Sequence, residues 1–275
     1  MIKFTRIMTA LLVSAVVLLA GRSAFAADYI IIQSTTSTRN SGLLETILPQ
    51  FTQETGFQAR VVSVGTGQAL RNARNGDGDV LLVHAKEAEQ EFVAEGWGVA
   101  RYDVMYNDFI IAGPKTDPAK ISGRTQAAQA LEQIAKSQSL FVSRGDDSGT
   151  HKAELRLWQA TNVDLTAASG SWYRETGSGM GATLNMATSV GAYVMTDRAT
   201  WISFANRGDL RVLVEGDPKM FNQYGVIAVN PARHPRVNAA GAEAFVNWIT
   251  SPQGQSAIGA YNLNGQPLFY PNAQR

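Results

Sequence analysis

Short apolar runs alternate in this sequence with stretches whose apolar residues recur at helical spacing, and this alternation limits the possible folds. Predicted strands cover residues 29–33, 60–64 and 79–84, and predicted helices cover residues 41–54 and 68–75. A strand–helix–strand succession requires crossover connections, which place helices on the faces of a parallel sheet. The sequence therefore predicts an α/β fold.

The rest of the chain continues this alternation with less regular spacing. Further strands are predicted at residues 106–112, 140–143, 210–214 and 223–229, and further helices at residues 125–139, 151–161, 182–197, 200–207 and 240–258. Two α/β halves without a low-complexity linker predict a hinged pair of lobes. We assign residues 27–112 and 223–275 to lobe I and residues 113–222 to lobe II.

Residues 1–26 have the pattern of a cleaved secretory signal peptide. Lys3 and Arg6 precede an apolar run at residues 7–20, and Ala24-Phe25-Ala26 supplies the small residues that signal peptidase requires. The apolar run is shorter than the roughly 20 residues of a membrane-spanning helix. The chain has no cysteine, which excludes disulfides, thiolate metal sites and a lipoprotein anchor. We therefore expect a periplasmic protein.

Charge gives no sign of a polyanionic partner. Residues 1–26 carry three basic residues and no acid, so the remaining chain has 21 basic and 23 acidic residues. A chain this close to neutral, with no basic run, predicts no binding to nucleic acid. Any small anion must therefore be held by a local site rather than by the overall field of the protein.

Turns rich in Gly, Ser and Thr stand next to the predicted strands and helices. They cover residues 34–38, 65–68 and 144–150, and a fourth covers residues 177–181. A helix N-terminus leaves backbone N–H groups unpaired and carries roughly +0.5 charge, while hydroxyls add neutral donors. One such turn is explained by helix capping alone. Several turns at strand ends predict an anion site in the crevice between the lobes.

Arg144 is the sharpest candidate among the charged residues. It ends a predicted strand and directly precedes the turn Gly-Asp-Asp-Ser-Gly-Thr150. A guanidinium donates two parallel hydrogen bonds to an oxyanion, and Asp146 is placed to balance its charge. The alternative is a structural Arg144–Asp146 pair.

Several motifs resemble those of the tungstate-binding proteins of bacterial ABC transporters, and the similarity covers nearly the whole chain after residue 26. They are Ser34-Thr-Thr-Ser-Thr38 followed by Ser41-Gly-Leu-Leu44, then Val64-Gly-Thr-Gly-Gln-Ala-Leu70, Asp79-Val-Leu-Leu-Val-His84, Tyr106-Asn-Asp-Phe-Ile-Ile-Ala-Gly-Pro114, Ser143-Arg-Gly-Asp-Asp-Ser-Gly-Thr-His151, Glu175-Thr-Gly-Ser-Gly-Met-Gly-Ala-Thr183 and Tyr224-Gly-Val-Ile-Ala-Val-Asn-Pro231. The resemblance implies a two-lobed type II periplasmic binding protein, each lobe a mostly parallel sheet flanked by helices. It also implies delivery of tungstate to a membrane permease. Ser34 replaces the first Thr of the family's Thr-Thr-Thr-Ser signature and keeps its hydroxyl.

The resemblance also implies which residues bind the anion. Carried over by position, they are Thr36, Ser37, Thr66, Arg144, Ser148, Thr150 and the backbone near Gly179 and Met180. Tungsten would be bound as an oxyanion and not as a metal cation, so we expect no cofactor and no metal site. We also expect a monomer. Molybdate is almost the same size as tungstate, and nothing in the sequence separates the two.

Other anions remain open as ligands. The turn after Ser143 is also similar to the Arg-x-Asp-x-Ser-Gly-Thr turn of phosphate-binding proteins, so a phosphate- or sulfate-binding protein of the same fold is an alternative. Tungstate, molybdate and sulfate carry no proton at neutral pH, whereas phosphate keeps at least one and needs an acceptor. The loop His84-Ala-Lys86 offers no such acceptor, but Asp146 and Asp147 do.

Enzymes and binders of organic anions are the remaining alternatives. Asp147-Ser148-Gly149 with His151 nearby suggests a secreted serine hydrolase, but the chain lacks a Gly-x-Ser-x-Gly elbow. A lone histidine on the first turn of a helix is usually a surface group. A binder of amino acids would need an aromatic wall, which Trp172 and Tyr173 would supply. We expect no catalytic residues and no enzymatic activity.

Overall fold

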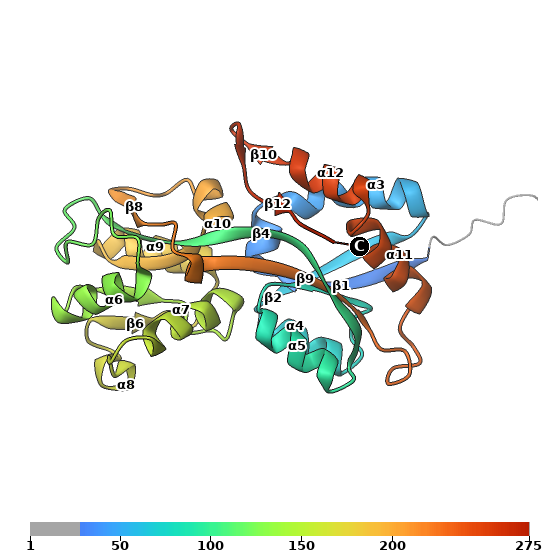
Figure 1. The fold of residues 1–275 in the computed structure, drawn as a ribbon, viewed down its shortest axis with the longest axis horizontal. Coiled ribbons are helices and arrows are strands. Elements are labelled where there is room, and N and C mark those ends of the chain that lie inside the picture. Colours follow the sequence, from blue (N-terminus) through green and yellow to red (C-terminus); the bar gives the residue numbers. More distant parts are fainter. Residues whose placement is uncertain (1–27, 275) are drawn as a thin grey trace, which may run out of the picture.

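The computed structural model describes residues 28–274, so the predicted signal peptide lies outside the described residues. Two long strands, β4 (Gly98–Pro114) and β9 (Phe221–Val229), run between two α/β halves (Figure 1). They pair antiparallel from Gly98–Val229 to Asp108–Phe221. In residues 28–274, no helix has both the length and the apolar character needed to span a bilayer.

The half that contains β1, here called the β1 half, is built on strand order β2-β1-β3-β9-β4. Its strands are β1 (Tyr29–Thr35), β2 (Gln58–Val64), β3 (Val80–Val83) and β12 (Tyr270–Pro271), with the hairpin β10 (Asn262–Leu263) and β11 (Gln266–Pro267); its helices are α2 (Thr36–Asn40), α3 (Leu43–Thr55), α4 (Thr66–Arg74), α5 (Lys86–Ala94), α11 (Ala239–Ile249) and α12 (Pro252–Ala260). Val80 and Leu82 pack beneath α3 and α11, whereas Leu81 and Val83 pack against α4 and α5. Both faces of this sheet are therefore covered, as its uninterrupted apolar strands require.

The other half, here called the β5 half, has strand order β4-β7-β5-β6, with β8 also paired to β4. Its elements are β5 (Phe141–Ser143), β6 (Tyr173–Glu175), β7 (Tyr193–Asp197), β8 (Leu210–Val214), α6 (Ala127–Lys136), α7 (Gly149–Gln159), α8 (Leu165–Ala168), α9 (Met180–Val190), α10 (Arg198–Ser203) and the 3-10 turn η1 (Pro218–Met220). Phe141 packs towards α6 and α7, and Val142 packs towards α9. This sheet also lies between two layers of helices (Figure 1).

The predicted α/β class is confirmed, but the sheet pairing is mixed rather than mostly parallel. The outer strands β2-β1-β3 and β7-β5-β6 are parallel. β4 and β9 run antiparallel to their neighbours, because both strands pass between the halves. The lobe boundaries at residues 112 and 222 stay a prediction, since both lie inside these continuous strands.

One strand prediction and one helix prediction were wrong in their bounds. β4 begins at Gly98, not at residue 106, and its first residues are partly exposed, which hid the strand pattern. The helix predicted over residues 182–197 ends at Val190, because Gly191 takes a left-handed conformation with φ of +62°. Residues 193–197 form β7 instead, fully buried between β4 and β5.

The buried carboxyl group of Glu154 is expected to make the stability of the fold depend on pH. Its side chain is buried in α7, and Oε1 accepts hydrogen bonds from Tyr173 Oη and Trp158 Nε1 at 2.8 and 3.2 Å. Burial raises the pKa of Glu154 to about 7, above its ordinary value of 4.5. The folded state therefore binds this proton more tightly than the unfolded state does. The proton stabilises the fold fully below pH 4.5, and this stabilisation is lost as the pH rises through 7.

We predict that Glu154→Gln removes this loss. Between pH 5 and pH 8, wild-type protein should lose about 2–3 kcal/mol more unfolding free energy than the variant. Urea unfolding at the two pH values measures the difference, and exposed Glu91→Gln is the control. Identical pH dependence in wild type and Glu154→Gln would contradict the assignment.

Candidate functional site

The four turns predicted from the sequence meet where the two halves face each other. Residues 34–38 and 65–68 follow β1 and β2, and residues 144–150 and 177–181 follow β5 and β6. Helices α4, α7 and α9 begin in three of these turns, each of nine residues or more. Their N-termini bring unpaired backbone N–H groups to the same region.

Close contacts join the turns of one half to those of the other. The Gly67 N–H donates to the carbonyl oxygen of Asp147 at 3.3 Å. A methyl group on Gly149 would lie only 2.8 Å from the His84 ring, and one on Gly179 would lie 3.8 Å from Thr36 Oγ1. The structure is therefore closed, with main chain of the two halves in direct contact at the site.

Three of the predicted site residues have buried hydroxyls without hydrogen-bond partners. These atoms are Oγ1 of Thr36, Thr66 and Thr150, and the last two residues are fully buried. An unsatisfied buried hydroxyl costs about 1–3 kcal/mol. These three unpartnered hydroxyls lie in the turns that contact one another, and they are the donors expected in a site whose ligand accepts hydrogen bonds.

Arg144 lies at the end of β5 and is 2% exposed. Its Nε and Nη2 donate to Asp146 Oδ2 at 3.2 and 2.6 Å, so the predicted Arg144–Asp146 pair is present. Two of the five guanidinium N–H groups are used in this pair, and the fork is held rigidly for a further acceptor. The Arg144 carbonyl accepts from the Ser178 N–H at 3.3 Å, which ties the turn at residues 177–181 to Arg144.

The remaining predicted residues contribute different groups. Ser148 caps α7, and its Oγ accepts from the His151 N–H at 3.2 Å, so its hydroxyl proton stays free to donate. Met180 is 1% exposed and packs in the apolar core with Leu184. Only its backbone, next to the cap residue Gly179, is placed at the turn, as the sequence predicted.

His84 lies at the candidate site but was not among the site residues predicted from the sequence. It follows β3 and is 4% exposed; its Nε2 lies 3.3 Å from Ser37 Oγ, and its ring stacks on Tyr224 with centroids 4.7 Å apart. Burial lowers the pKa of His84 to about 4, with Arg144 adding to the effect and Asp197 opposing it. The imidazole is therefore neutral at pH 7. Its position directly after a strand of the parallel β2-β1-β3 set was the available signal.

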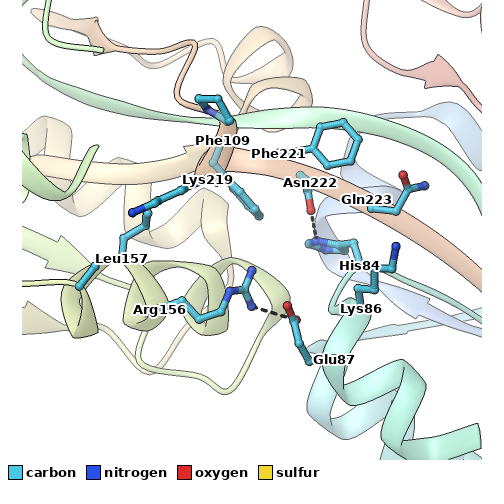
Figure 2. A pocket seen from close by; sticks show the side chains of 12 residues that line it. His84, Lys86, Glu87, Phe109, Arg156, Leu157, Lys219, Phe221, Asn222 and Gln223 are labelled. Carbon is cyan, nitrogen blue, oxygen red and sulfur yellow. Dashed lines mark hydrogen bonds and ion pairs between the residues drawn. The ribbon is translucent and has the colours of Figure 1, made fainter. Parts of the chain in front are cut away.

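An open groove of about 480 Å³ lies beside this closed site, between the two halves (Figure 2). His84 forms part of its wall, and the basic side chains Lys86, Arg156 and Lys219 face it from both halves. Glu87 pairs with Arg156 across the groove at 3.3 Å. The excess of basic groups makes the groove favourable to an approaching anion.

Asp147 forms a second ion-pair bridge between the halves. Its carboxylate pairs with Arg71 of α4 at 3.1 Å and with Lys152 of α7 at 2.5 Å. Burial alone would raise the pKa of Asp147, but the hydrogen bonds from Lys152 and Arg71 outweigh it and lower the pKa. The three side chains are between 32% and 54% exposed, so each pair contributes little energy. Only the Arg71 pair joins the two halves, because Lys152 belongs to the same half as Asp147.

The alternatives from the sequence find less support in this geometry. His151 Nδ1 accepts from the Asp147 N–H at 3.2 Å, and Ser148 Oγ meets the backbone of His151 rather than its ring. Tyr173 is buried in the β5 half, stacked on Phe141, and does not wall the site. Across residues 28–274, no cluster of three or more His, Cys, Asp or Glu is arranged to hold a metal ion.

Comparison with known proteins agrees with the two-lobed architecture. Residues 22–253 match the family model described as the PBP superfamily domain. The tungstate-binding protein TupA of Peptoclostridium acidaminophilum is 51% identical over 250 residues, which cover 90% of this chain and 86% of that protein.

Solved structures give the same result. The tungstate-binding protein TupA from Desulfovibrio alaskensis G20 is 48% identical, with a TM-score of 0.77, over 90% of this chain and all of that one. The tungstate ABC transporter structure from Geobacter sulfurreducens is 46% identical, with a TM-score of 0.77, and the match covers 85% of this chain and 98% of that chain. The chain belongs to the PBP superfamily of solute-binding proteins and, within it, to the family of the tungstate-binding protein TupA.

Gly67 allows a test of the contact between the halves. A Cβ at this position would overlap the Asp147 carboxylate and lie 3.1 Å from the Asp147 carbonyl oxygen. We predict that Gly67→Ala weakens tungstate binding roughly tenfold to hundredfold, because it holds the halves apart. The unfolding midpoint without ligand should change little.

Calorimetric titration with tungstate, the ligand named for the relatives, measures the effect. Gly259→Ala in α12 is the control, because its Cβ would meet only the Pro271 ring, at 3.3 Å. Wild-type affinity in Gly67→Ala would show that the contact plays no part in binding.

Proposed function

We propose that this chain is the periplasmic solute-binding component of an ABC importer, which captures tungstate between two lobes and delivers it to a membrane permease. The observation that carries the proposal is that three unpartnered threonine hydroxyls and buried Arg144 belong to turns that contact one another across the two halves. The names of the relatives supply the identity of the anion. Molybdate, which is isosteric, is proposed as a second ligand.

Hydrogen-bond capacity favours an anion without protons. Asp146 Oδ2 accepts from Arg144, and its Oδ1 accepts from the Ser148 N–H at 3.3 Å. Asp147 is engaged by Lys152 and Arg71. Both carboxylates already accept hydrogen bonds from protein groups, and this reduces their capacity to accept the proton of phosphate. This supports tungstate, molybdate or sulfate over phosphate.

Binding of a dianion in such a site must offset a large loss of hydration. Arg144 supplies a charge-assisted hydrogen bond, and the hydroxyls and N–H groups at the starts of α4, α7 and α9 supply neutral donors. These groups would contact the oxygens of the anion, and tungsten itself would touch no protein atom. No step requires a cofactor or bond breaking, so we propose binding without catalysis.

Opening and closing of the halves would control access to the site. β4 and β9 are the two strands that run between the halves, and Asn107 pairs with Asn222 where they do so. We propose that the protein works as a monomer that closes over the anion by bending at this point. The closed form would be the one that the permease recognises.

The first test is a calorimetric titration of ligand-free protein, lacking residues 1–26, with tungstate, molybdate, sulfate and phosphate. We predict tight one-to-one binding of tungstate and no heat from phosphate. Binding of phosphate or sulfate alone would contradict the choice of anion while preserving the transport role. No binding of any of the four would contradict the oxyanion site itself.

A second test concerns Arg144. We predict that Arg144→Ala weakens tungstate binding by roughly 2–5 kcal/mol, because the variant loses a buried charge-assisted hydrogen bond. Arg174→Ala, on the exposed side of the β5 half, is the matched control and should bind as wild type does. Unchanged affinity in Arg144→Ala would remove Arg144 from the site.

A further inference from the structure

A chain of buried polar side chains leads from the two connecting strands to the site. Asn222 Nδ2 on β9 donates to Asn107 Oδ1 on β4 at 2.7 Å. Asn222 Oδ1 lies 3.0 Å from His84 Nδ1, and His84 Nε2 lies 3.3 Å from Ser37 Oγ (Figure 2 shows the first of these contacts). All four residues are at most 4% exposed, so water does not substitute for these bonds.

The hydrogen-bond partners of Asn222 determine which ring nitrogen of His84 carries a hydrogen. Because the amide nitrogen of Asn222 donates to Asn107, its oxygen faces His84, and His84 Nδ1 must carry a hydrogen. In the neutral ring Nε2 then has only a lone pair, and its neighbour with a hydrogen to donate is the Ser37 hydroxyl. The other partner of Ser37 Oγ is Thr35 Oγ1 at 3.1 Å, which can donate to it. With its own proton directed at His84, Ser37 Oγ presents only lone pairs elsewhere, and these would repel an oxyanion.

We propose that His84 takes up one proton when the oxyanion binds, and that this proton converts the Ser37 hydroxyl into a donor to the anion. The proton comes from solvent and adds to Nε2. Nδ1–H continues to donate to Asn222, Nε2–H donates to Ser37 Oγ, and the Ser37 O–H turns to the anion. This inference rests on the proposed function and makes His84 a positioning residue of the site.

The charges around His84 fit this exchange. In the free protein, burial and Arg144 keep the imidazole neutral. A bound dianion adds two negative charges, while the charge of Arg144 is already offset by Asp146. The other groups that face His84 are buried Asp197 at the start of α10, which favours the cation, Tyr224 on β9, whose pKa burial raises well above 10, and the groove residues Lys86, Glu87 and Arg156.

Selectivity would follow from the same exchange. With His84 neutral, Ser37 is an acceptor and suits an anion that keeps a proton. With His84 cationic, Ser37 is a donor and suits tungstate, molybdate or sulfate. His84 thus influences which class of oxyanion fits, through Ser37 and without touching the ligand.

Proton uptake can be counted by titrating tungstate calorimetrically in buffers of different ionisation enthalpy. We expect the wild type to take up close to one proton at a pH between the free and bound pKa values. Affinity should rise up to about tenfold for each unit of falling pH in that window. His84→Gln should take up none and show a flat profile. His151→Gln and His234→Gln, which replace the other two histidines, should keep the uptake.

Tight tungstate binding by wild type without proton uptake from pH 8 to pH 5.5 would overturn the inference and leave the proposed function intact. Equal uptake by His84→Gln would also overturn it. Absence of tungstate binding by wild type would instead contradict the proposed function. If His84→Gln fails to fold, ¹⁵N-histidine NMR of wild type decides: His84 should carry one ring N–H when free and two when tungstate is bound, and an unchanged ring would overturn the inference.

Discussion

An oxyanion can be removed from water only where hydrogen-bond donors from several chain segments converge, and this convergence depends on β4 and β9. Neither half alone has the full set of proposed donors, because Thr36 and Thr66 belong to one half and Arg144 and Thr150 to the other. The two strands hold the halves so that their strand-end turns meet. The contact between Gly67 and Asp147 shows how closely the main chains approach.

The local parts of this arrangement could be predicted from sequence, because each has a local cause. Apolar runs indicated the buried strands, and the Gly, Ser and Thr turns and the Arg144–Asp146 pair followed from residue types at strand ends. β7 and the first part of β4 could not be predicted, since pairing across the sheet overrides their local pattern. His84 was missed for a similar reason: its partners Asn222 and Ser37 are distant in the chain.

The neighbouring groove and the closed site have different electrostatic roles in the proposed binding of an anion. Basic side chains in the groove lie at the surface, where they attract anions without discriminating strongly among them. Within the site, a single buried guanidinium is combined with neutral donors, so the fit depends on the protons that the anion carries. We therefore infer that the buried groups determine which oxyanion is bound. The Asn107–Asn222–His84–Ser37 chain connects those groups to the strands on which closure depends.

The most direct test of this account is to locate tungsten in crystals of the tungstate-loaded protein by anomalous diffraction. The account predicts one strong anomalous peak enclosed by the hydroxyls of Thr36, Thr66 and Thr150, with Arg144 donating to a ligand oxygen. A peak in the open groove near Lys86 and Arg156, with the threonine hydroxyls still unpartnered, would contradict it.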